Sequence, residues 1–310
     1  MKPIEIKKLI SARTAYNTGL TEKTAILFDG VTYMFKPAVL DSNGNFQKTS
    51  ESEYIGSHIY QILGIPAHDT LLATYKGRTG VLCKDFLVNS PDDLILYEFG
   101  AIAKDYFIKE GLSSPDLSHE KTSLLQVLQV LGQADLLEEV RNEAHDRFWQ
   151  MFVIDSLIEN YDRHIGNWGY IFNKNTDSIS LAPVYDCAAS LNPQHSDDDI
   201  SEILKLDKGK MLYRLEFGYQ SSAIRNDNPN TKMTLDHVLF DLKESGCIKA
   251  ILEIVPKIEE MMPSLAEMIN WIETLSSERQ DYIKETLQYR QRNILFPAYQ
   301  KLIETGFKDS

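Results

Sequence analysis

The first third of the chain alternates short apolar runs with turn residues, and this pattern predicts β-strands. Apolar runs at 24–28 and 31–35 flank an Asp-Gly dipeptide, which suits a two-residue hairpin because both residues tolerate a positive φ. Runs at 70–75 and 79–83 flank a Lys-Gly-Arg turn in the same way. We therefore predict two β-hairpins before residue 85.

Between these hairpins the apolar spacing changes to the helical period of 3.6 residues. Ile55, Ile59 and Ile62 recur at that spacing, and the Ser-Glu-Ser-Glu run at 50–53 has the form of a capping box. We predict a helix that begins in this run and ends at 64–66, because a Gly-Ile-Pro sequence stops a helix.

Helical spacing dominates the chain from about residue 90 onward. Segments 92–108, 121–131 and 143–159 each carry apolar residues at this period. The last segment is apolar on almost all sides after Phe148. We therefore predict that it forms a central, buried helix.

Two further apolar runs, 168–172 and 179–181, predict a short hairpin after that helix. Three aspartates at 197–199 suit the start of a helix, whose dipole favours negative charge there, better than they suit a metal cluster. Residues 200–305 are mostly helical in pattern. Four prolines would punctuate this region: Pro229, Pro256, Pro263 and Pro297.

These elements predict an α+β fold with two lobes, a β-rich N-lobe at 1–85 and a mostly helical C-lobe at 86–310. A chain of 310 residues with 43% hydrophobic and 25% charged residues is ordinary for a soluble globular protein. Its formal net charge is −13. This charge argues against direct binding of nucleic acids or anionic membranes, because both need clustered Lys and Arg.

Cysteine usage and the N-terminal residues predict a reducing, cytoplasmic setting. Cys83, Cys187 and Cys247 are far apart, so neither a disulfide framework nor a zinc site is predicted. The first residues are charged and lack the apolar core of a signal peptide, although export by a route without such a signal stays open. No run approaches the ~18 apolar residues of a membrane span, so no membrane partner is expected.

The strongest candidate for chemistry lies between residues 160 and 186. Asp162 precedes Asn167 by five residues, and Asp186 follows nineteen residues later, after the predicted hairpin. This is the layout of a phosphoryl-transfer site, in which the first Asp orients or deprotonates the attacking hydroxyl. Asn167 and Asp186 would supply oxygen ligands to Mg²⁺, which bridges the phosphates of a nucleotide. The alternative is a polar loop whose Asp and Asn side chains serve an Asx-turn.

The motif Asn-Tyr-Asp-Arg-His at 160–164, with Ala-Pro-Val-Tyr-Asp-Cys at 182–187, resembles the HipA-like serine/threonine kinases, in particular their short, single-domain type. The order Asp-Arg-His is also found in phosphatidylinositol kinases. The resemblance implies a two-lobed, protein-kinase-like fold with ATP in the cleft between the lobes and Mg²⁺ as the metal. His164 would either stabilise the γ-phosphate or hold the loop by hydrogen bonds, whereas Arg163 is interpreted as structural.

Lys36 ends the second predicted strand and shares a face with Met34. It would either snorkel at the strand end or reach a phosphate, and the resemblance implies phosphate contact. The resemblance also implies an ion pair between Lys36 and a helix glutamate. We favour Glu53 over Glu51 for this pair, while the alternative for Glu53 is to close the helix start as part of the capping box.

Two further segments have roles that the resemblance implies. The run at 18–23 is similar to the family's Ala-Gly-Ala-Gln-Glu-Lys phosphate loop. It keeps the glycine, the glutamate and the lysine as Gly19, Glu22 and Lys23, but it departs at its Leu-Thr pair. The link between the lobes, which includes Lys84 and Phe86, would give the adenine of ATP its backbone hydrogen bonds.

The resemblance implies a protein substrate with a Ser or Thr hydroxyl and phosphorylation of the chain's own phosphate loop, where hydroxyls lie between Ser11 and Thr21. HipA-like toxins are often encoded beside a DNA-binding antitoxin, so an antitoxin-like protein partner is a further possibility. Two other readings stay open. One is a small-molecule or lipid kinase, and the other is a nucleotide-binding pseudokinase that acts as an interaction module.

Overall fold

The computed structural model describes residues 1–6, 24–42, 44–111, 122–206, 221–225 and 232–306. The chain forms two compact units that are each assembled from three stretches of sequence. The first unit comprises Met1–Pro91, Pro183–Arg214 and Met261–Thr286, and the second comprises Asp92–Ala182, Leu215–Glu260 and Leu287–Ser310. The predicted phosphate loop, with Gly19 and Lys23, lies outside the described residues.

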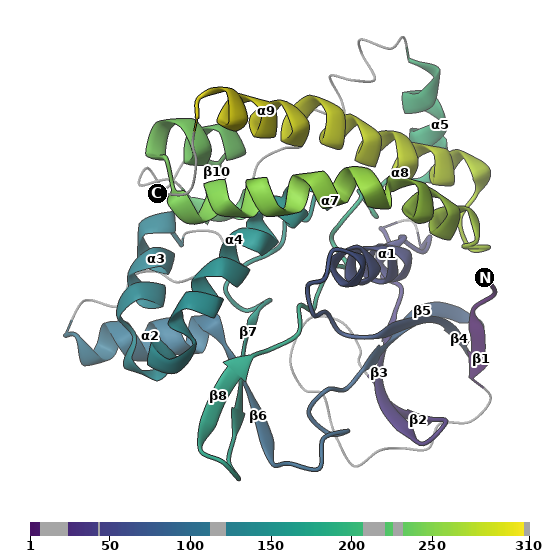
Figure 1. Ribbon diagram of the computed structural model, residues 1–310. Helices are drawn as coiled ribbons and strands as arrows, with labels where there is room; N and C mark the ends of the chain where they lie inside the picture. The colour runs from purple at the N-terminus through teal and green to yellow at the C-terminus, as the bar shows by residue number, and fades with distance from the viewer. Residues whose placement is uncertain (7–23, 43, 112–121, 207–220, 226–231, 307–310) are drawn as a thin grey trace. The chain divides into compact units, whose positions relative to one another are not determined.

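The first unit contains a curled five-stranded sheet in the order β1-β4-β5-β3-β2 (Figure 1). Both predicted hairpins are confirmed, because β2 pairs antiparallel with β3 and β4 pairs antiparallel with β5. Asp29 and Gly30 join β2 to β3 with φ angles of 47° and 79°, which explains the Asp-Gly dipeptide. The strands are β1 (Ile4–Ile6), β2 (Thr24–Phe28), β3 (Val31–Pro37), β4 (Thr70–Tyr75) and β5 (Arg78–Lys84).

Strand β3 lies between β2 and β5, and its side chains alternate between the two faces of the sheet. Phe35 lies opposite Leu82 of β5, and both side chains are buried in a cluster with Ile26. The next residue, Lys36, therefore points to the other face of the sheet. The same sheet face carries Cys83, which lies opposite Met34.

Helix α1 (Thr49–Ile62) forms where the apolar spacing predicts it, but the capping box is wrong. The helix begins one residue before Ser50, Lys48 occupies the N-cap position, and no side-chain cap hydrogen bond forms there. The residues at 50–53 consequently lie within the first turns, and all four are buried. The carboxylate of Glu53 contacts the ammonium of Lys36 instead of closing the start of its own helix.

The second unit contains a three-stranded antiparallel sheet in the order β6-β7-β8. The hairpin of β7 (Gly169–Asn173) and β8 (Ser178–Leu181) was predicted. The helix predicted over 92–108 is wrong in its first half, where strand β6 (Leu94–Glu98) precedes helix α2 (Phe99–Lys109). Five residues of β6 pair with β7, a segment more than seventy positions away, and this non-local ladder overrides the local helical spacing.

The helices of the second unit include the predicted central one. Helix α3 (Leu124–Gln133) begins with a capping box of Ser123 and Gln126. Helix α4 (Arg141–Ile158) follows the short 3-10 helix η1 (Asp135–Val140), and every residue from Phe152 to its end is buried. This burial confirms the prediction of a rigid, buried helix immediately before residue 160.

The rest of the chain is mainly helical. The three aspartates open α5, where Ser196 and Asp199 form a capping box, as expected of a helix start. The elements are α5 (Asp197–Lys205), β9 (Ser221–Arg225), β10 (Lys232–Met233), the π-helix η2 (His237–Leu242), α7 (Ser245–Asn270), α8 (Ser277–Arg290), the π-helix η3 (Gln291–Leu295) and α9 (Phe296–Glu304).

Helix α7 passes through two of the prolines that were predicted to divide this region, Pro256 and Pro263. Each proline lacks an N–H and leaves one helical carbonyl without its partner. Both prolines lie on the exposed side of the helix, seven residues apart, where water can hydrogen bond the freed carbonyls. The opposite side buries apolar residues such as Ile258 and Leu265, and this burial stabilises the continuous helix.

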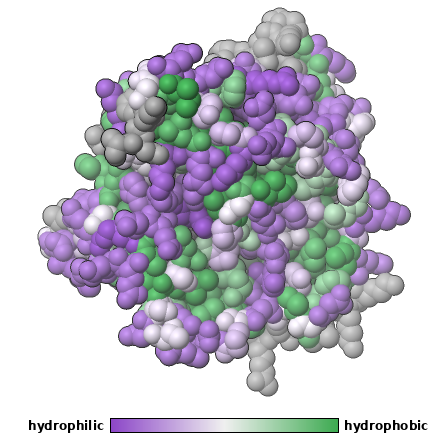
Figure 2. Space-filling view, in the orientation of Figure 1, coloured by the Kyte–Doolittle hydropathy of each residue, from purple (hydrophilic) through white to green (hydrophobic). Residues whose placement is uncertain are grey.

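The surface mixes polar and apolar residues. Figure 2 shows hydrophilic residues interspersed with hydrophobic ones over the visible face. The large apolar side chains with the greatest exposure are Leu125, Trp271 and Ile108. Among the described helices, none has both the length and the apolar character that a bilayer crossing requires.

Candidate active site

Lys36 is the centre of a buried charge cluster in the first unit. Its Nζ lies 3.4 Å from Oε2 of Glu53 and 3.2 Å from Oδ1 of Asp186, while the lysine side chain is only 13% exposed. Burial by itself would lower the pKa of Lys36, but the charges of Asp186 and Glu53 outweigh it and raise this pKa well above its ordinary value. The side chain is therefore an ammonium ion shared between two carboxylates.

Glu53 accepts hydrogen bonds on both of its carboxylate oxygens. Besides Lys36, its Oε1 accepts from Nε2 of His68 at 2.8 Å and from the backbone N–H of Cys187 at 3.0 Å. Burial would raise the pKa of Glu53, yet the charge of Lys36 and the hydrogen bond from His68 hold it well below its ordinary value. The predicted ion pair is thus present, and Glu53 rather than Glu51 makes it.

Asp186 has a backbone conformation that few residue types adopt readily. Its φ is 61°, in the left-handed region, where Asp is better tolerated than most non-glycine residues. Two residues earlier, Val184 exchanges backbone hydrogen bonds with Pro66 and His68, at 2.8 and 3.0 Å. This bridge fixes the segment, and the Asp186 side chain stays one-third exposed while Lys36 holds one of its oxygens.

The loop after α4, in the second unit, is anchored by a buried ion pair. Arg163 donates from Nε and Nη2 to the two oxygens of Asp155, at 2.9 and 3.3 Å, and from Nη1 to the carbonyl of Asn167 at 2.8 Å. Both charged side chains are less than a tenth exposed. Arg163 therefore has the structural role that was expected of it, and Asp155 of α4 is its partner.

This loop holds Asp162 by its backbone and leaves its carboxylate at the surface. The Asp162 N–H donates to Oδ1 of Asn160 at 3.2 Å, and the Asp162 carbonyl accepts from Nδ2 of Asn167 at 2.8 Å. The carboxylate side chain is 54% exposed. His164 accepts from the Gly166 N–H on Nδ1, and its Nε2 lies 4.0 Å from the Asp162 carboxylate.

The predicted adenine link lies at the end of β5. The Lys84 side chain pairs with Asp69 at 3.0 Å on the surface, and the Phe86 ring lies 6.3 Å from that of Tyr185. The Asp85 N–H donates to the carbonyl of Thr32. The part that these residues play in nucleotide binding stays a prediction.

Asn167 and Asp186 each carry side-chain oxygens of the type that suits a hard divalent cation. The amide nitrogen of Asn167 is committed to the Asp162 carbonyl, so the side chain can offer its oxygen to a metal. The Asp186 carboxylate, one oxygen of which accepts from Lys36 at 3.2 Å, also consists of oxygen donors. Both are oxygen donors of the kind that Mg²⁺ prefers. Asn167 belongs to the second unit and Asp186 to the first.

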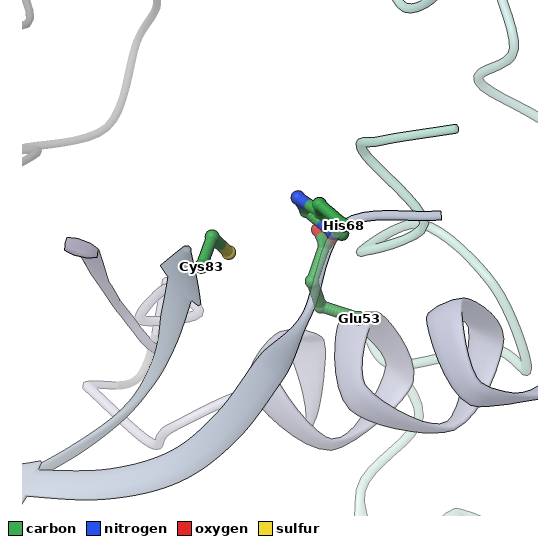
Figure 3. A group of neighbouring side chains, drawn as sticks. All are labelled: Glu53, His68 and Cys83. Atoms are coloured by element: carbon green, nitrogen blue, oxygen red, sulfur yellow. The ribbon is translucent and has the colours of Figure 1, made fainter. Parts of the chain in front are cut away.

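Figure 3 shows a second group, in which Glu53 of α1, His68 from the segment before β4, and Cys83 of β5 lie together. Their ligand atoms lie within 4.8 Å of one another, and these are donor types that zinc accepts. However, burial raises the pKa of the Cys83 thiol well above its ordinary value, so the thiol is protonated. Glu53 already holds an ammonium ion at 3.4 Å, which would repel a divalent cation. We interpret Glu53 and His68 as a hydrogen-bonded pair that lies beside the Cys83 thiol.

Sequence reasoning missed two contributors to the site. His68 lies in a loop after Pro66 and belongs to no motif, so its position gives no signal. The backbone N–H of Cys187 carries no side-chain information at all. Asp155 is a carboxylate in a buried helix and therefore needs a partner, but nothing in the sequence shows that Arg163 is that partner.

Comparison with known proteins identifies relatives over nearly the whole chain. The serine/threonine-protein kinase CtkA of Helicobacter pylori is 27% identical over 302 residues, which cover 96% of this chain and 88% of that protein. The crystal structure of the Helicobacter pylori proinflammatory kinase CtkA matches with a TM-score of 0.85 and 26% identity, covering 99% of this chain and all of the other. These matches confirm the predicted α+β, kinase-like fold.

A more distant likeness concerns the fold alone. HipA of Shewanella oneidensis, in a structure of the HipA, HipB and operator DNA complex, matches with a TM-score of 0.55 and 13% identity. The match covers 92% of this chain and 67% of that one. A family model described as the HipA-like C-terminal domain matches residues 16–262, well over half of the sequence. The chain therefore belongs to the HipA-like C-terminal domain family.

Proposed function

We propose that this chain is an ATP-dependent serine/threonine protein kinase of the HipA-like type. The observation that carries the proposal is the buried Lys36 ammonium, held by Glu53 and Asp186 in one cluster. A cation fixed in this way can neutralise nucleotide phosphates, which is the main demand of phosphoryl transfer. The relative named as a serine/threonine-protein kinase supports the same function.

Each residue of the site has a role in the proposed reaction. Lys36 binds the ATP phosphates, and Asp162 accepts the proton of the attacking Ser or Thr hydroxyl. Asn167 and Asp186 would hold Mg²⁺, which would offset the charge of the phosphates. His164, whose Nδ1 accepts a backbone N–H, keeps the proton of its neutral ring on Nε2 and can donate it toward the phosphates.

The remaining predicted parts complete the proposal. In this proposal ATP would bind between the predicted N-lobe at 1–85 and the predicted C-lobe at 86–310, the predicted phosphate loop with Gly19 and Lys23 would contact the phosphates, and the link at Lys84 and Phe86 would receive the adenine. The substrate is a protein hydroxyl, and one candidate is a hydroxyl in the chain's own phosphate loop. An antitoxin-like protein partner is a separate proposal, which inspection of the neighbouring genes would test.

The proposed function is tested by incubating the purified chain with ATP and Mg²⁺ and mapping phosphate by mass spectrometry. We expect phosphate on Ser or Thr, including positions between Ser11 and Thr21, and no phosphate when EDTA removes the metal. Transfer to small alcohols or lipids without any phosphoprotein would favour the small-molecule kinase. Tight ATP binding without transfer to any acceptor would favour the pseudokinase. Either result would overturn the proposal.

Replacement of Lys36 by alanine is expected to lower kcat/KM for ATP by about 100-fold or more, because a charged group that stabilises the transferring phosphate is lost. Stability should fall far less, because His68 and the Cys187 N–H still donate to Glu53. Steady-state kinetics and thermal unfolding measure the two effects. Lys205→Ala is the matched control, since Lys205 is exposed in the last turn of α5.

The alternative for Lys36 is that its ammonium only snorkels at a strand end. In that case Lys36→Ala would behave like Lys205→Ala, with a normal rate and a normal affinity for ATP. This outcome would remove Lys36 from the proposed mechanism.

A further inference from the structure

Glu53 receives three hydrogen-bond donors, and they connect separate parts of the first unit. Lys36 comes from β3, His68 precedes β4, and the backbone N–H of Cys187 follows Asp186 directly. Glu53 itself is 0% exposed, so no water replaces a lost donor without rearrangement. The orientation of this carboxylate therefore depends on the donors that the protein supplies.

His68 is the second side chain among these donors, beside Lys36, and the backbone around it fixes its position. The His68 N–H donates to Val184, the Val184 N–H donates to Pro66, and residues 67 and 184 form a parallel bridge. The same bridge lies two residues before Asp186. The backbone of His68 is thus hydrogen-bonded to the segment that leads to Asp186, and its ring contacts Glu53 (Figure 3).

The hydrogen bond between His68 and Glu53 also determines which ring nitrogen of His68 carries a hydrogen. An ionised carboxylate accepts but does not donate, so the Nε2 atom of His68 at 2.8 Å must carry a hydrogen. This requirement holds for the neutral ring in one tautomer and for the imidazolium. In both forms Oε1 of Glu53 is held toward the ring, and Oε2 is directed to Lys36.

We infer that His68 is a positioning residue of the proposed kinase, which orients Glu53 so that Lys36 is shared between Glu53 and Asp186. This inference rests on the proposed function. Without the ring, the Cys187 N–H is the only donor to Oε1 among the described residues, and the carboxylate can rotate away from Lys36. The ammonium then pairs with Asp186 alone and leaves its position for the phosphates. His68 touches neither nucleotide nor substrate in this scheme.

Three variants test the inference in the full-length chain. His68→Ala removes the donor, whereas His68→Gln retains an amide N–H that reaches about as far as Nε2. His58→Ala is the matched control, because His58 is on the same helix as Glu53 but its ring contacts the carbonyl of Tyr54. We expect KM for ATP to rise about tenfold in His68→Ala, to stay within about threefold of wild type in His68→Gln, and to be unchanged in His58→Ala.

Two readouts separate positioning from a merely structural role. A structural role lowers kcat in proportion to the folded fraction and leaves KM for ATP unchanged, so a raised KM supports positioning. Nitrogen-15 NMR of the imidazole rings needs no activity, and it should show a hydrogen on Nε2 of His68 near neutral pH. If His68→Gln does not fold, the KM for ATP of the folded His68→Ala variant and the NMR signal of the wild-type ring still test the inference.

The inference is overturned if an active wild-type chain and His68→Ala share the same KM for ATP, or if the His68 ring carries its hydrogen on Nδ1 alone. Failure of the proposed function looks different, because the wild-type chain itself would then transfer no phosphate. If the wild-type chain is inactive although the His68 ring carries its hydrogen on Nε2, the proposed kinase function is wrong, and the positioning role is wrong with it.

Discussion

Asp162→Asn and Asp186→Asn are each expected to lower the rate of phosphoryl transfer by about 10³-fold or more while the fold stays intact. A general base contributes about 10²–10⁴-fold, and Asp162 loses this capacity as an amide. Asp186→Asn removes a charged metal ligand and weakens the contact with Lys36. The fold should persist because Asp162 joins its loop through backbone atoms and the Asp186 side chain is one-third exposed.

The two variants should differ in nucleotide binding. Asp186→Asn is expected to weaken Mg²⁺-dependent binding of ATP, measured by titration calorimetry, whereas Asp162→Asn should bind ATP as the wild type does. The reason is that Asp186 would hold the metal, while Asp162 would act on the hydroxyl. Asp198→Asn is a suitable control, since this exposed aspartate lies in the first turn of α5. Full activity in either site variant would remove the kinase interpretation.

Asp155→Ala is expected to destabilise the chain by about 3–5 kcal/mol, because it leaves the Arg163 guanidinium buried without its carboxylate. Denaturant unfolding of the purified variant measures this loss. Activity should fall as well, since Arg163 also holds the Asn167 carbonyl and therefore shapes the loop that carries Asp162. Asp146→Ala is the matched control on the same helix, where an exposed pair with Lys249 should contribute less than about 1 kcal/mol.

A double variant separates stability from function at this anchor. Asp155→Leu combined with Arg163→Met replaces the buried ion pair by apolar side chains, and such replacements are often neutral or stabilising. We expect the double variant to recover most of the stability that Asp155→Ala loses. Its activity should stay low, because Arg163→Met removes the contact with the Asn167 carbonyl. A stability close to that of wild type in Asp155→Ala itself would contradict the assigned role of the ion pair.

Local patterns predicted the parts of the fold that depend on neighbouring residues. The Asp-Gly turn between β2 and β3 could be read directly, because the positive φ values that it needs are a property of those two residues. Helix α4 could be read from its continuous apolar character. The spacing of Asp162 and Asn167 was visible for the same reason, since one short loop contains both and they contact each other.

Long-range pairing explains where the local patterns failed. Leu94–Glu98 has helical spacing, yet it is a strand because β7 offers a complementary edge. Glu53 has the position of a capping residue, yet Lys36 and His68 draw its carboxylate away from the helix end. Pro256 is a residue that usually ends a helix, yet α7 continues through it because burial of its apolar side stabilises the helix by more than one lost hydrogen bond costs.

The candidate site shows the same division. By itself, the sequence determined the residue types and spacings of the proposed phosphoryl-transfer site, including Lys36 and Asp186, because these are chemical requirements on individual side chains. Only the tertiary structure decided that these two, 150 positions apart, form an ion pair, and that His68 supports it. Such contacts depend on how distant segments pack, and the free energy of that packing is not encoded in the spacing of any single stretch.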